Sequence, residues 1–476
     1  MKEYKVQYKT VKAPKKDGPE TPVPLSDATI EERKKKVLAR MEKAGIEQLV
    51  VYGDTEHSGN FEYLIGFFTR FEEGLLVIKA DGRMNLVLGN ENLNKAPKAR
   101  VEAGCVHVPA FSLPNQPCEV AKTLREQLIE AGVEPGKRTG IAGWKLFTSP
   151  YEENEKLFDV PAFIVDSIRS IAGEEMVQNA TVLFIGADGV RTTNNANEIA
   201  HYEFAAALAS DCMLEAMDAM EEGVSEMELG SHLNRFGQRN SVVTIASSGP
   251  RFVKANMYPT DNTVKTGDTI SLTVGYRGGL SSRAGYAVRN REELPKGAQD
   301  YLERVAAPYF NSYAHWLSAI RVGMAGGELY RLVEETLPKS EFHWGLCPGH
   351  LTAEEEWLCS PIRKDSQELL RSGMLLQIDI IPAVPGYGGV SAESTIALAD
   401  ETLRGEIEKQ YPKLWERIKA RRMYLQETLG IPLPKEVLPM CSTVAYLRPY
   451  LLKKDAALVW EAKRVLRPTA ERRQPI

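Results

Sequence analysis

Short apolar runs alternate with polar and turn residues up to residue 190, and this pattern predicts strands separated by helices. Ser26 suits the N-cap of a helix that Gly45 ends. The strands expected after this helix are QLVVYG, FEYLIGF, GLLVIKADG, RMNLVLG, CVHVPAF, TGIAGW and VLFIGA. GLLVIKADG and RMNLVLG form a hairpin-like pair across Asp81-Gly82, and a helix at 120–131 precedes TGIAGW. The alternation predicts an α/β domain of about 150 residues.

Beyond residue 190 the apolar positions follow longer helical stretches. A long helix begins in NEIAHYEFAAALASD and breaks at Gly223, and Ser225 caps a second helix. Strand-rich segments follow in SVVTIASSGP and DTISLTVGYRGGLSSRAGYAVRN, and two helices then cover about 296–322 and 326–337. We expect an N-terminal extension, an α/β domain, a second α+β domain and a C-terminal helical extension with a basic tail, at 1–27, 28–188, 189–400 and 401–476.

The stretch SGMLLQIDIIPAVPGYGGVSAESTIAL, residues 372–398, predicts two apolar strands at 374–382 and 390–398 joined by a Pro/Gly-rich turn. Each strand carries one carboxylate, Asp379 in the first and Glu393 in the second. A buried carboxylate costs several kcal/mol unless it is paired, hydrogen-bonded or bound to a metal. Two of them on neighbouring strands indicate a functional site. The alternative is that one or both cap a turn or face water.

The composition of the chain indicates which kinds of binding partner are unsuitable. The chain has 476 residues, 43% hydrophobic and 26% charged, with a net charge of −5, which argues against binding to nucleic acid or an anionic membrane. No apolar run reaches the roughly 20 residues of a spanning helix, and the charged N-terminus lacks a signal-peptide core. The six cysteines show no zinc-finger spacing. We therefore expect a cytoplasmic protein with free thiols.

A series of short motifs carries a family resemblance. ASSGPRFVKANMYPTD, KTGDTISLTVG, GHLTAEEEWLCSP, SGMLLQIDI and GGVSAESTIAL occur in this order, and together they resemble the pita-bread family of methionine and Xaa-Pro aminopeptidases, prolidase and creatinase. NFEYLIGFFTR is similar to a strand of the creatinase-type N-terminal domain. The resemblance covers about residues 28–400 and implies a creatinase-type α/β domain followed by a pita-bread domain.

In the metallopeptidases of this family, two aspartates, a histidine and two glutamates hold a two-metal centre. The resemblance places His350 at the histidine position and Asp379 and Glu393 at the glutamate positions, but the aspartate positions fall on Thr273 and Ala284. A threonine hydroxyl is a poor ligand and alanine is none, so no paired-metal centre is expected. We expect no cofactor, although His350, Asp379 and Glu393 together leave room for one weakly held divalent ion.

The lack of both aspartates resembles the pattern of creatinase, the metal-independent member of the family. The resemblance places the proton-transfer histidine of creatinase at Asn256 of this chain. An amide cannot shuttle a proton near neutral pH. We therefore assign proton transfer to His350, oriented by Asp379 and Glu393. The resemblance further suggests that Asn256 and Thr273 position substrate or water and that Arg70 binds a substrate carboxylate.

Three functions remain open. The leading prediction is a metal-independent, creatinase-like hydrolase of a C–N bond in a small amino-acid-like molecule. The second is a catalytically degenerate protein that binds a small ligand, a peptide or a protein, and the third is an Xaa-Pro peptidase with an unusual metal site. Creatinase-like proteins are usually homodimers, so the resemblance implies a homodimer. Two simpler interpretations compete locally, namely that His350 is an ordinary loop histidine and that Glu354–Glu356 is a solvated face.

Overall fold

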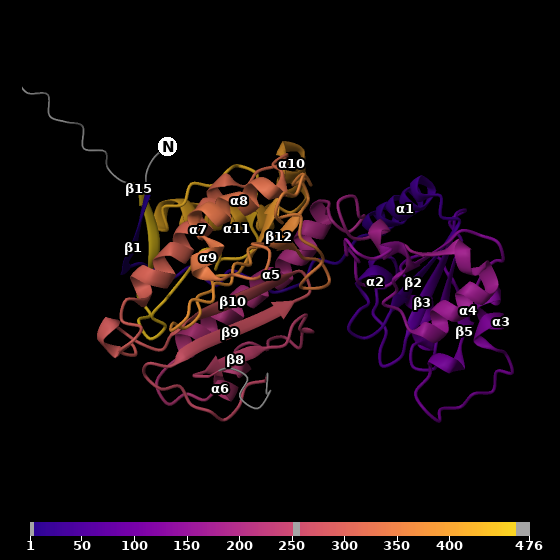
Figure 1. The fold of residues 1–476 in the computed structure, drawn as a ribbon, viewed down its shortest axis with the longest axis horizontal. Coiled ribbons are helices and arrows are strands. Elements are labelled where there is room, and N and C mark those ends of the chain that lie inside the picture. The colour runs from indigo at the N-terminus through magenta and orange to yellow at the C-terminus, as the bar shows by residue number, and fades with distance from the viewer. Residues whose placement is uncertain (1–3, 251–257, 463–476) are drawn as a thin grey trace, which may run out of the picture.

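The computed structural model describes residues 4–250 and 258–462. The chain forms two bodies side by side, a smaller N-terminal α/β domain and a larger domain that contains the rest of the chain (Figure 1). No helix in the described residues is long and apolar enough to cross a membrane.

The N-terminal domain is built on a mixed sheet with the strand order β5-β4-β3-β2-β6-β7. Its elements are α1 (Asp27–Ala44), β2 (Gln48–Gly53), α2 (Gly59–Ile65), β3 (Gly74–Lys79), β4 (Met84–Leu88), β5 (Gly104–His107), α3 (Leu124–Glu130), β6 (Thr139–Ala142), α4 (Ala162–Ala172) and β7 (Val177–Asn179). Val50 and Tyr52 of β2 pack in one apolar cluster, whereas Leu49 and Val51 pack in another. Both faces of the sheet are therefore covered, and the α/β prediction is confirmed.

Several local predictions for this domain are confirmed. The Ser26 hydroxyl caps α1 by accepting from the Thr29 amide at 3.1 Å, and Gly45 ends the helix with a left-handed φ of 65°. Strands β3 and β4 pair antiparallel across the turn at Gly82. The expected helix at 120–131 is shorter, because its capping box begins at Thr123.

The prediction of a strand is wrong for two segments. FEYLIGF lies in the helix α2, which ends at Gly66, and VLFIGA contains a 3-10 turn at Thr181–Leu183 in place of a strand. Both segments are almost wholly apolar and buried. A short apolar run buried on all sides carries no periodicity, so it does not distinguish a helix or turn from a strand.

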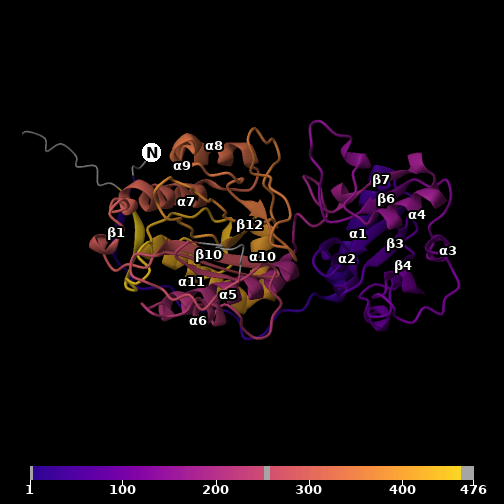
Figure 2. The same cartoon turned by 60° about the horizontal axis from the view of Figure 1, so that its bottom comes forward.

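The second domain starts with the long helix α5 (Ala196–Ala219), which packs along β9 and β10 (Figure 2). The predicted break at Gly223 and the Ser225 cap are confirmed. The elements that follow are α6 (Glu226–Ser231), β8 (Ile245–Ser248), β9 (Thr269–Tyr276), β10 (Gly279–Tyr286), α7 (Ala307–Ala319), α8 (Gly326–Thr336), α9 (Lys339–Phe342), β11 (His350–Leu351), β12 (Leu375–Gln377) and β13 (Thr395–Leu398). Two sheets result, with the orders β10-β9-β8 and β11-β12-β13-β14.

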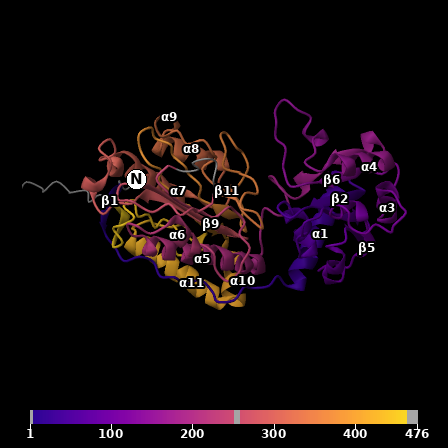
Figure 3. The same ribbon diagram turned by 90° about the horizontal axis from the view of Figure 1, so that it is seen from below.

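The two ends of the chain complete this domain. The C-terminal part forms α10 (Glu401–Gln410), α11 (Pro412–Met423), β14 (Val437–Pro439) and β15 (Ala456–Ala462). Strand β14 pairs with β13, and β15 pairs with β1 (Tyr4–Thr10). After β1, residues 11–26 run along the second domain to α1 (Figure 3). The ion pair of Asp17 with Arg421, at 2.8 Å, holds this segment in place. The N-terminal extension and residues 401–462 are thus both packed against the second domain.

Candidate functional site

The two carboxylates singled out by the sequence face each other. Strands β12 and β13 pair antiparallel, and the Ile378 amide donates to the Ser394 carbonyl at 3.1 Å. This register puts Asp379 opposite Glu393, and side chains of directly opposed residues point to the same side of a sheet. Both predicted strands are shorter than expected, and each carboxylate lies just beyond the end of its strand.

His350 joins the two carboxylates because β11 lies beside β12, with His350 opposite Gln377. The His350 Nε2 atom is 3.9 Å from Asp379 Oδ2 and 3.9 Å from Glu393 Oε1. The imidazole is 0% exposed, and both carboxylates are buried. The structure therefore brings together the three residues expected to form the site.

Each member of the cluster has an unused polar atom. His350 Nε2, Asp379 Oδ1 and Glu393 Oε1 are buried and have no hydrogen-bond partner in the described part of the chain. On the other side of the ring, His350 Nδ1 lies 3.1 Å from the Leu351 carbonyl. Because a carbonyl only accepts, Nδ1 carries the hydrogen in the neutral ring and Nε2 presents its lone pair to the carboxylates. Buried polar atoms are rarely left unpaired, so the cluster is a candidate site for a proton, an ion or a substrate group.

Burial sets the protonation of the cluster. It lowers the pKa of His350 to about 4. Burial, with a smaller contribution from Glu356, raises the pKa of Asp379 to about 7. Burial and the charge of Asp379 raise the pKa of Glu393 well above its ordinary range. At neutral pH His350 is therefore neutral and Glu393 holds a proton, so the 3.9 Å contacts are not ion pairs.

The acidic run before Trp357 was expected to be solvated, and this expectation is wrong. Glu354 is buried, pairs with Arg191 at 2.7 Å and accepts from the Tyr202 hydroxyl at 2.7 Å. Glu355 also binds Arg191. Burial raises the pKa of Glu356 to about 7, and Glu356 in turn raises the pKa of Asp379 and Glu393. Sequence reasoning missed Glu356 as a third acidic group near the site, because the buried cations that neutralise its neighbours are far away in the chain.

Trp357 covers the histidine. Its ring stacks on the imidazole of His350 with 4.0 Å between ring centroids and 24° between planes, and Trp357 is 41% exposed. The side chains of Asp379 and Glu393 are only 6% and 8% exposed. A substrate that reaches His350 must therefore displace Trp357 or enter beside it.

The two positions at which the resemblance places the metallopeptidase aspartates lie on β9 and β10 and carry uncharged side chains. Thr273 lies opposite Ser282, and their hydroxyls are 2.9 Å apart. Ala284 lies opposite Ser271 on the same face of the hairpin. Among the described residues, His350, Asp379 and Glu393 are the one group of His, Cys, Asp or Glu side chains arranged to hold a metal.

Arg283 is a buried cation next to this cluster. Its guanidinium donates to the backbone carbonyls of Ser282, Glu393, Thr443 and Tyr446 at 2.6, 2.8, 2.5 and 3.0 Å. A further bond reaches the Ser394 hydroxyl. The side chain thus fixes the backbone that carries Glu393, which is a structural role.

The structure describes one of the two remaining residues expected to bind substrate, Arg70 but not Asn256. Arg70 is exposed, and its guanidinium lies over the ring of Phe71 at 4.5 Å. Asn256 lies outside the described residues.

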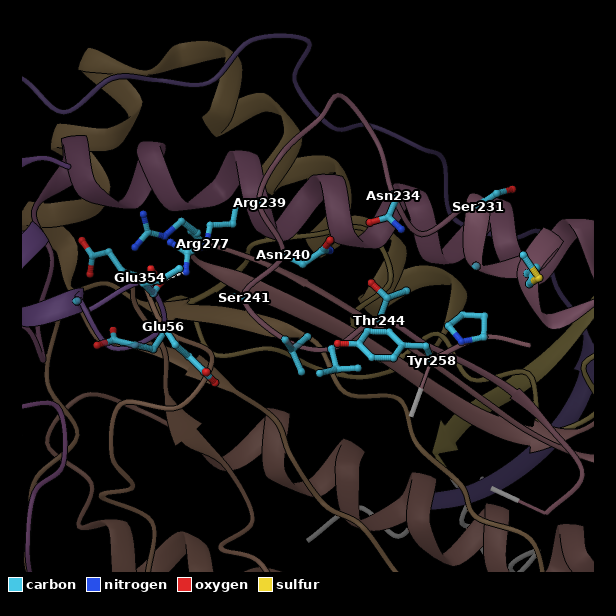
Figure 4. A pocket seen from close by; sticks show the side chains of 18 residues that line it. Glu56, Ser231, Asn234, Arg239, Asn240, Ser241, Thr244, Tyr258, Arg277 and Glu354 are labelled. Carbon is cyan, nitrogen blue, oxygen red and sulfur yellow. Dashed lines mark hydrogen bonds between the residues drawn. The ribbon is translucent and has the colours of Figure 1, made fainter. Parts of the chain in front are cut away.

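A cavity of about 770 Å³ lies between the two domains (Figure 4). Its walls include Glu56 from the N-terminal domain, Tyr258, Arg277 and the pair Glu354 and Glu355. His350, Asp379 and Glu393 are not among its described lining residues. The loop that contains Glu354 and Glu355 connects the cavity to the cluster, because Glu356 is the next residue in the chain.

Comparison with known proteins identifies the second domain. Residues 200–400 match metallopeptidase family M24. These residues form a peptidase M24 domain. A relative by sequence, the "Uncharacterized peptidase YqhT" of Bacillus subtilis (strain 168), is 23% identical over 220 residues, which are 44% of this chain and 61% of that protein.

Solved structures extend the similarity beyond the M24 domain. A prolidase from Thermococcus sibiricus superposes with a TM-score of 0.60 at 18% identity, over 78% of this chain and 95% of that one. A Pyrococcus horikoshii dipeptidase gives 0.58 at 19%, over 77% and 94%. An Xaa-Pro dipeptidase from Bacillus anthracis gives 0.57 at 18%, over 78% and 94%. These similarities establish the pita-bread fold and confirm the fold prediction.

The M24 site of this chain suits one metal ion better than two. Two ligands about 2.1 Å from one ion are at most about 4.2 Å apart, and the 3.9 Å separations of His350 from Asp379 and Glu393 lie within this limit. One ligand atom from each of the three residues lies within 4.8 Å of the others, and each residue has an atom without a hydrogen-bond partner in the described chain. Thr273 and Ala284, where the resemblance places the aspartates, provide no negative charge to hold a second ion.

Proposed function

We propose that the M24 domain hydrolyses a C–N bond in a small amino-acid-like molecule without the paired metal ions of the metallopeptidases. One observation carries the proposal: His350, Asp379 and Glu393 converge in the core, and each has a buried polar atom that lacks a hydrogen-bond partner in the described chain. The resemblance places the metal-binding aspartates at Thr273 and Ala284, which carry no charge. A cluster of this kind provides both a proton acceptor and a proton donor.

The acceptor is His350. As the oxygen of a water molecule forms a bond to the substrate carbon, the water gives a proton to Nε2, whose lone pair faces the site. The imidazolium that forms is 3.9 Å from Asp379, whose carboxylate stabilises it above about pH 7. Because burial disfavours the imidazolium, this negative charge is required for the step.

The donor is Glu393, which keeps its proton at neutral pH. As the C–N bond breaks, the leaving nitrogen takes that proton, and Glu393 becomes a carboxylate. The proton on His350 then returns to Glu393, 3.9 Å away, because the imidazole has a low pKa and the carboxyl a high one. The cycle consumes one water molecule and restores all three side chains.

A substrate panel tests this proposal. Purified protein is incubated with guanidino, ureido and N-acyl amino acids, and released amine or ammonia is measured. His350→Gln should abolish turnover of any substrate found. The control is His343→Asn, an exposed histidine with a φ of 51° that asparagine tolerates. Full turnover by His350→Gln would refute the assignment of His350.

A second candidate is an Xaa-Pro peptidase that uses one divalent ion. Two observations favour it: the 3.9 Å separations suit a single ion, and several proteins with this fold are named prolidase or Xaa-Pro dipeptidase. His350, Asp379 and Glu393 would hold the ion, which would supply Lewis-acid chemistry. Activity on Xaa-Pro dipeptides that requires one stoichiometric ion would favour this candidate over the first.

We also propose that the chain forms a homodimer, as the creatinase-like proteins it resembles usually do. Arg70 is exposed, so it is available to a second subunit. Light scattering should give twice the chain mass of 53.0 kDa. A monomer would leave Arg70 without the proposed role.

A further inference from the structure

One end of the cavity between the two domains holds Arg239, a cation that has no ion-pair partner among the described residues. The guanidinium groups of Arg239 and Arg277 lie over the same ring, that of Phe68, at 4.3 and 5.6 Å. Arg277 is neutralised by both carboxylate oxygens of Glu62. Arg239 donates to the Thr55 carbonyl but makes no ion pair within the described residues, and its Nη1 has no hydrogen-bond partner there.

The surroundings of Arg239 favour an incoming anion. Burial and the like charge of Arg277 lower the pKa of Arg239 by more than the nearby carboxylates of Glu62, Glu56 and Asp54 raise it. The nearby cavity-lining acids Glu354 and Glu355 do not neutralise it, because both are engaged by Arg191. Guanidinium groups bind carboxylates through two parallel hydrogen bonds, so a ligand carboxylate is the natural partner.

A negative charge is available at the same end of the cavity. Glu56 follows Thr55, the residue that accepts from Arg239, and its side chain lines the cavity (Figure 4). Glu56 makes no ion pair in the part of the chain that is described, although it lies close enough to raise the pKa of Arg239 slightly. An uncompensated guanidinium and an uncompensated carboxylate on one wall suit a ligand that carries both charges.

The lining also includes apolar side chains. Met227, Val242, Val243 and Pro259 contribute apolar surface, beside polar residues such as Asn234 and Thr244. The volume of about 770 Å³ is in the usual range for a small-molecule pocket, roughly 300–1,000 Å³. The cavity therefore has room for an apolar side chain in addition to a charged head group.

We infer that this cavity binds a zwitterionic, amino-acid-like ligand, with its carboxylate on Arg239, its ammonium group on Glu56 and its apolar part against Val242 and Met227. The inference rests on the proposed function insofar as it treats the cavity as the substrate side of the M24 site. The physical link is the loop in which Glu355 lines the cavity and Trp357, two residues further, stacks on His350.

Calorimetric titration with three probes tests the inference without requiring turnover. L-leucine carries both charges, N-acetyl-L-leucine lacks the ammonium group, and L-leucinamide lacks the carboxylate. L-leucine should bind at least about 10-fold more tightly than either derivative, because each charge-assisted contact is worth about one order of magnitude or more. Equal binding of the three probes, or no binding of L-leucine at millimolar concentration, would overturn the inference.

Variants of Arg239 and Glu56 test which residue binds each charged group of the ligand. Arg239→Met should weaken L-leucine binding about 10-fold or more, and Arg239→Lys should restore part of it. Glu56→Gln should weaken L-leucine but leave N-acetyl-L-leucine unchanged. Arg235→Met is the matched control, since Arg235 pairs with Glu215 and is not among the described lining residues. If Arg239→Met does not fold, Arg239→Lys and the three probes on the wild type still decide the matter.

The outcomes separate this inference from the proposed function. Tight, Arg239-dependent binding of L-leucine with no hydrolysis of any C–N substrate would refute the function alone. Hydrolysis that is unaffected by Arg239→Met would refute the ligand site alone.

Discussion

The carboxyl groups of Asp379 and Glu393 lie opposite each other at the ends of β12 and β13. Each is buried, and the charge of Asp379 helps to raise the pKa of Glu393. Two carboxyl groups that share a site separate their protonation steps, so that one is a proton donor while the other can ionise. The site is therefore poised for proton transfer when no cation balances its charge.

Replacing Asp379 with asparagine should stabilise the protein, and the gain should depend on pH. The pKa of Asp379 in the folded protein, about 7, lies above its ordinary value of 3.8, so its contribution to stability is complete below pH 4 and is lost as pH rises through 7. Asp379→Asn should match the wild type near pH 4 and exceed it at pH 8 by at least about 1 kcal/mol. Urea unfolding at several pH values measures this difference. The surface variant Asp166→Asn should show no such trend.

The opposite sign would be informative. If Asp379→Asn were less stable than the wild type at pH 8, the ionised carboxylate would be stabilising in the folded state. A bound cation is the simplest cause of that result.

Removing the ring of Trp357 should expose His350. The pKa of His350 should then rise from about 4 toward 6.5, because burial is what lowers it. NMR titration of ¹³C-labelled histidines in Trp357→Ala measures the change. The control is Trp144→Ala, which removes an equivalent ring stacked on His57 at 4.5 Å and should leave His350 unchanged. An unaltered His350 titration in Trp357→Ala would contradict the covering role of Trp357.

Arg283 should be essential for stability. Arg283→Met removes the charged donor from the buried carbonyls of Ser282, Glu393 and Thr443, although each of them keeps a second donor. Hydrogen bonds to charged groups contribute about 1.5–3 kcal/mol each, so a loss of roughly 3 kcal/mol or more in the free energy of unfolding is expected. Arg289→Met, at an exposed arginine, should change it by less than about 0.5 kcal/mol. Similar values for the two variants would refute the structural role of Arg283.

Restoring the two aspartates should create a paired-metal site. Thr273 and Ala284 share the face of the β9–β10 hairpin on which the family places them. Thr273→Asp combined with Ala284→Asp adds two carboxylates to His350, Asp379 and Glu393. Equilibrium dialysis with Mn²⁺ should give about two ions per chain, and no more than one in the wild type. Two ions bound by the wild type would contradict the ligand assignment.

The sequence predicts the elements whose signals are local. Ser26 and Gly45 define α1 through capping chemistry, and Asp81-Gly82 marks the turn between β3 and β4. The meeting of Asp379, Glu393 and His350 could also be predicted, because the motifs that carry them fix the register of three neighbouring strands.

Long-range partners could not be predicted. The acidic run at Glu354 is buried because Arg191 neutralises it from a segment more than 160 residues away. Strand β1 forms because β15 lies beside it, and no local pattern announces this pairing. FEYLIGF resembles a strand of the family but forms a helix, since uniform burial removes the periodicity that would reveal it.

The most direct test of the central claim is turnover of the chelator-treated wild type, with the metal content of the same sample measured by mass spectrometry. With a C–N substrate from the panel, we expect undiminished activity at far less than one ion per chain. The pH profile should rise through about 7, as Asp379 ionises, and fall at higher pH, as Glu393 loses its proton. Activity that disappears on chelation and returns with a stoichiometric divalent ion would contradict the account.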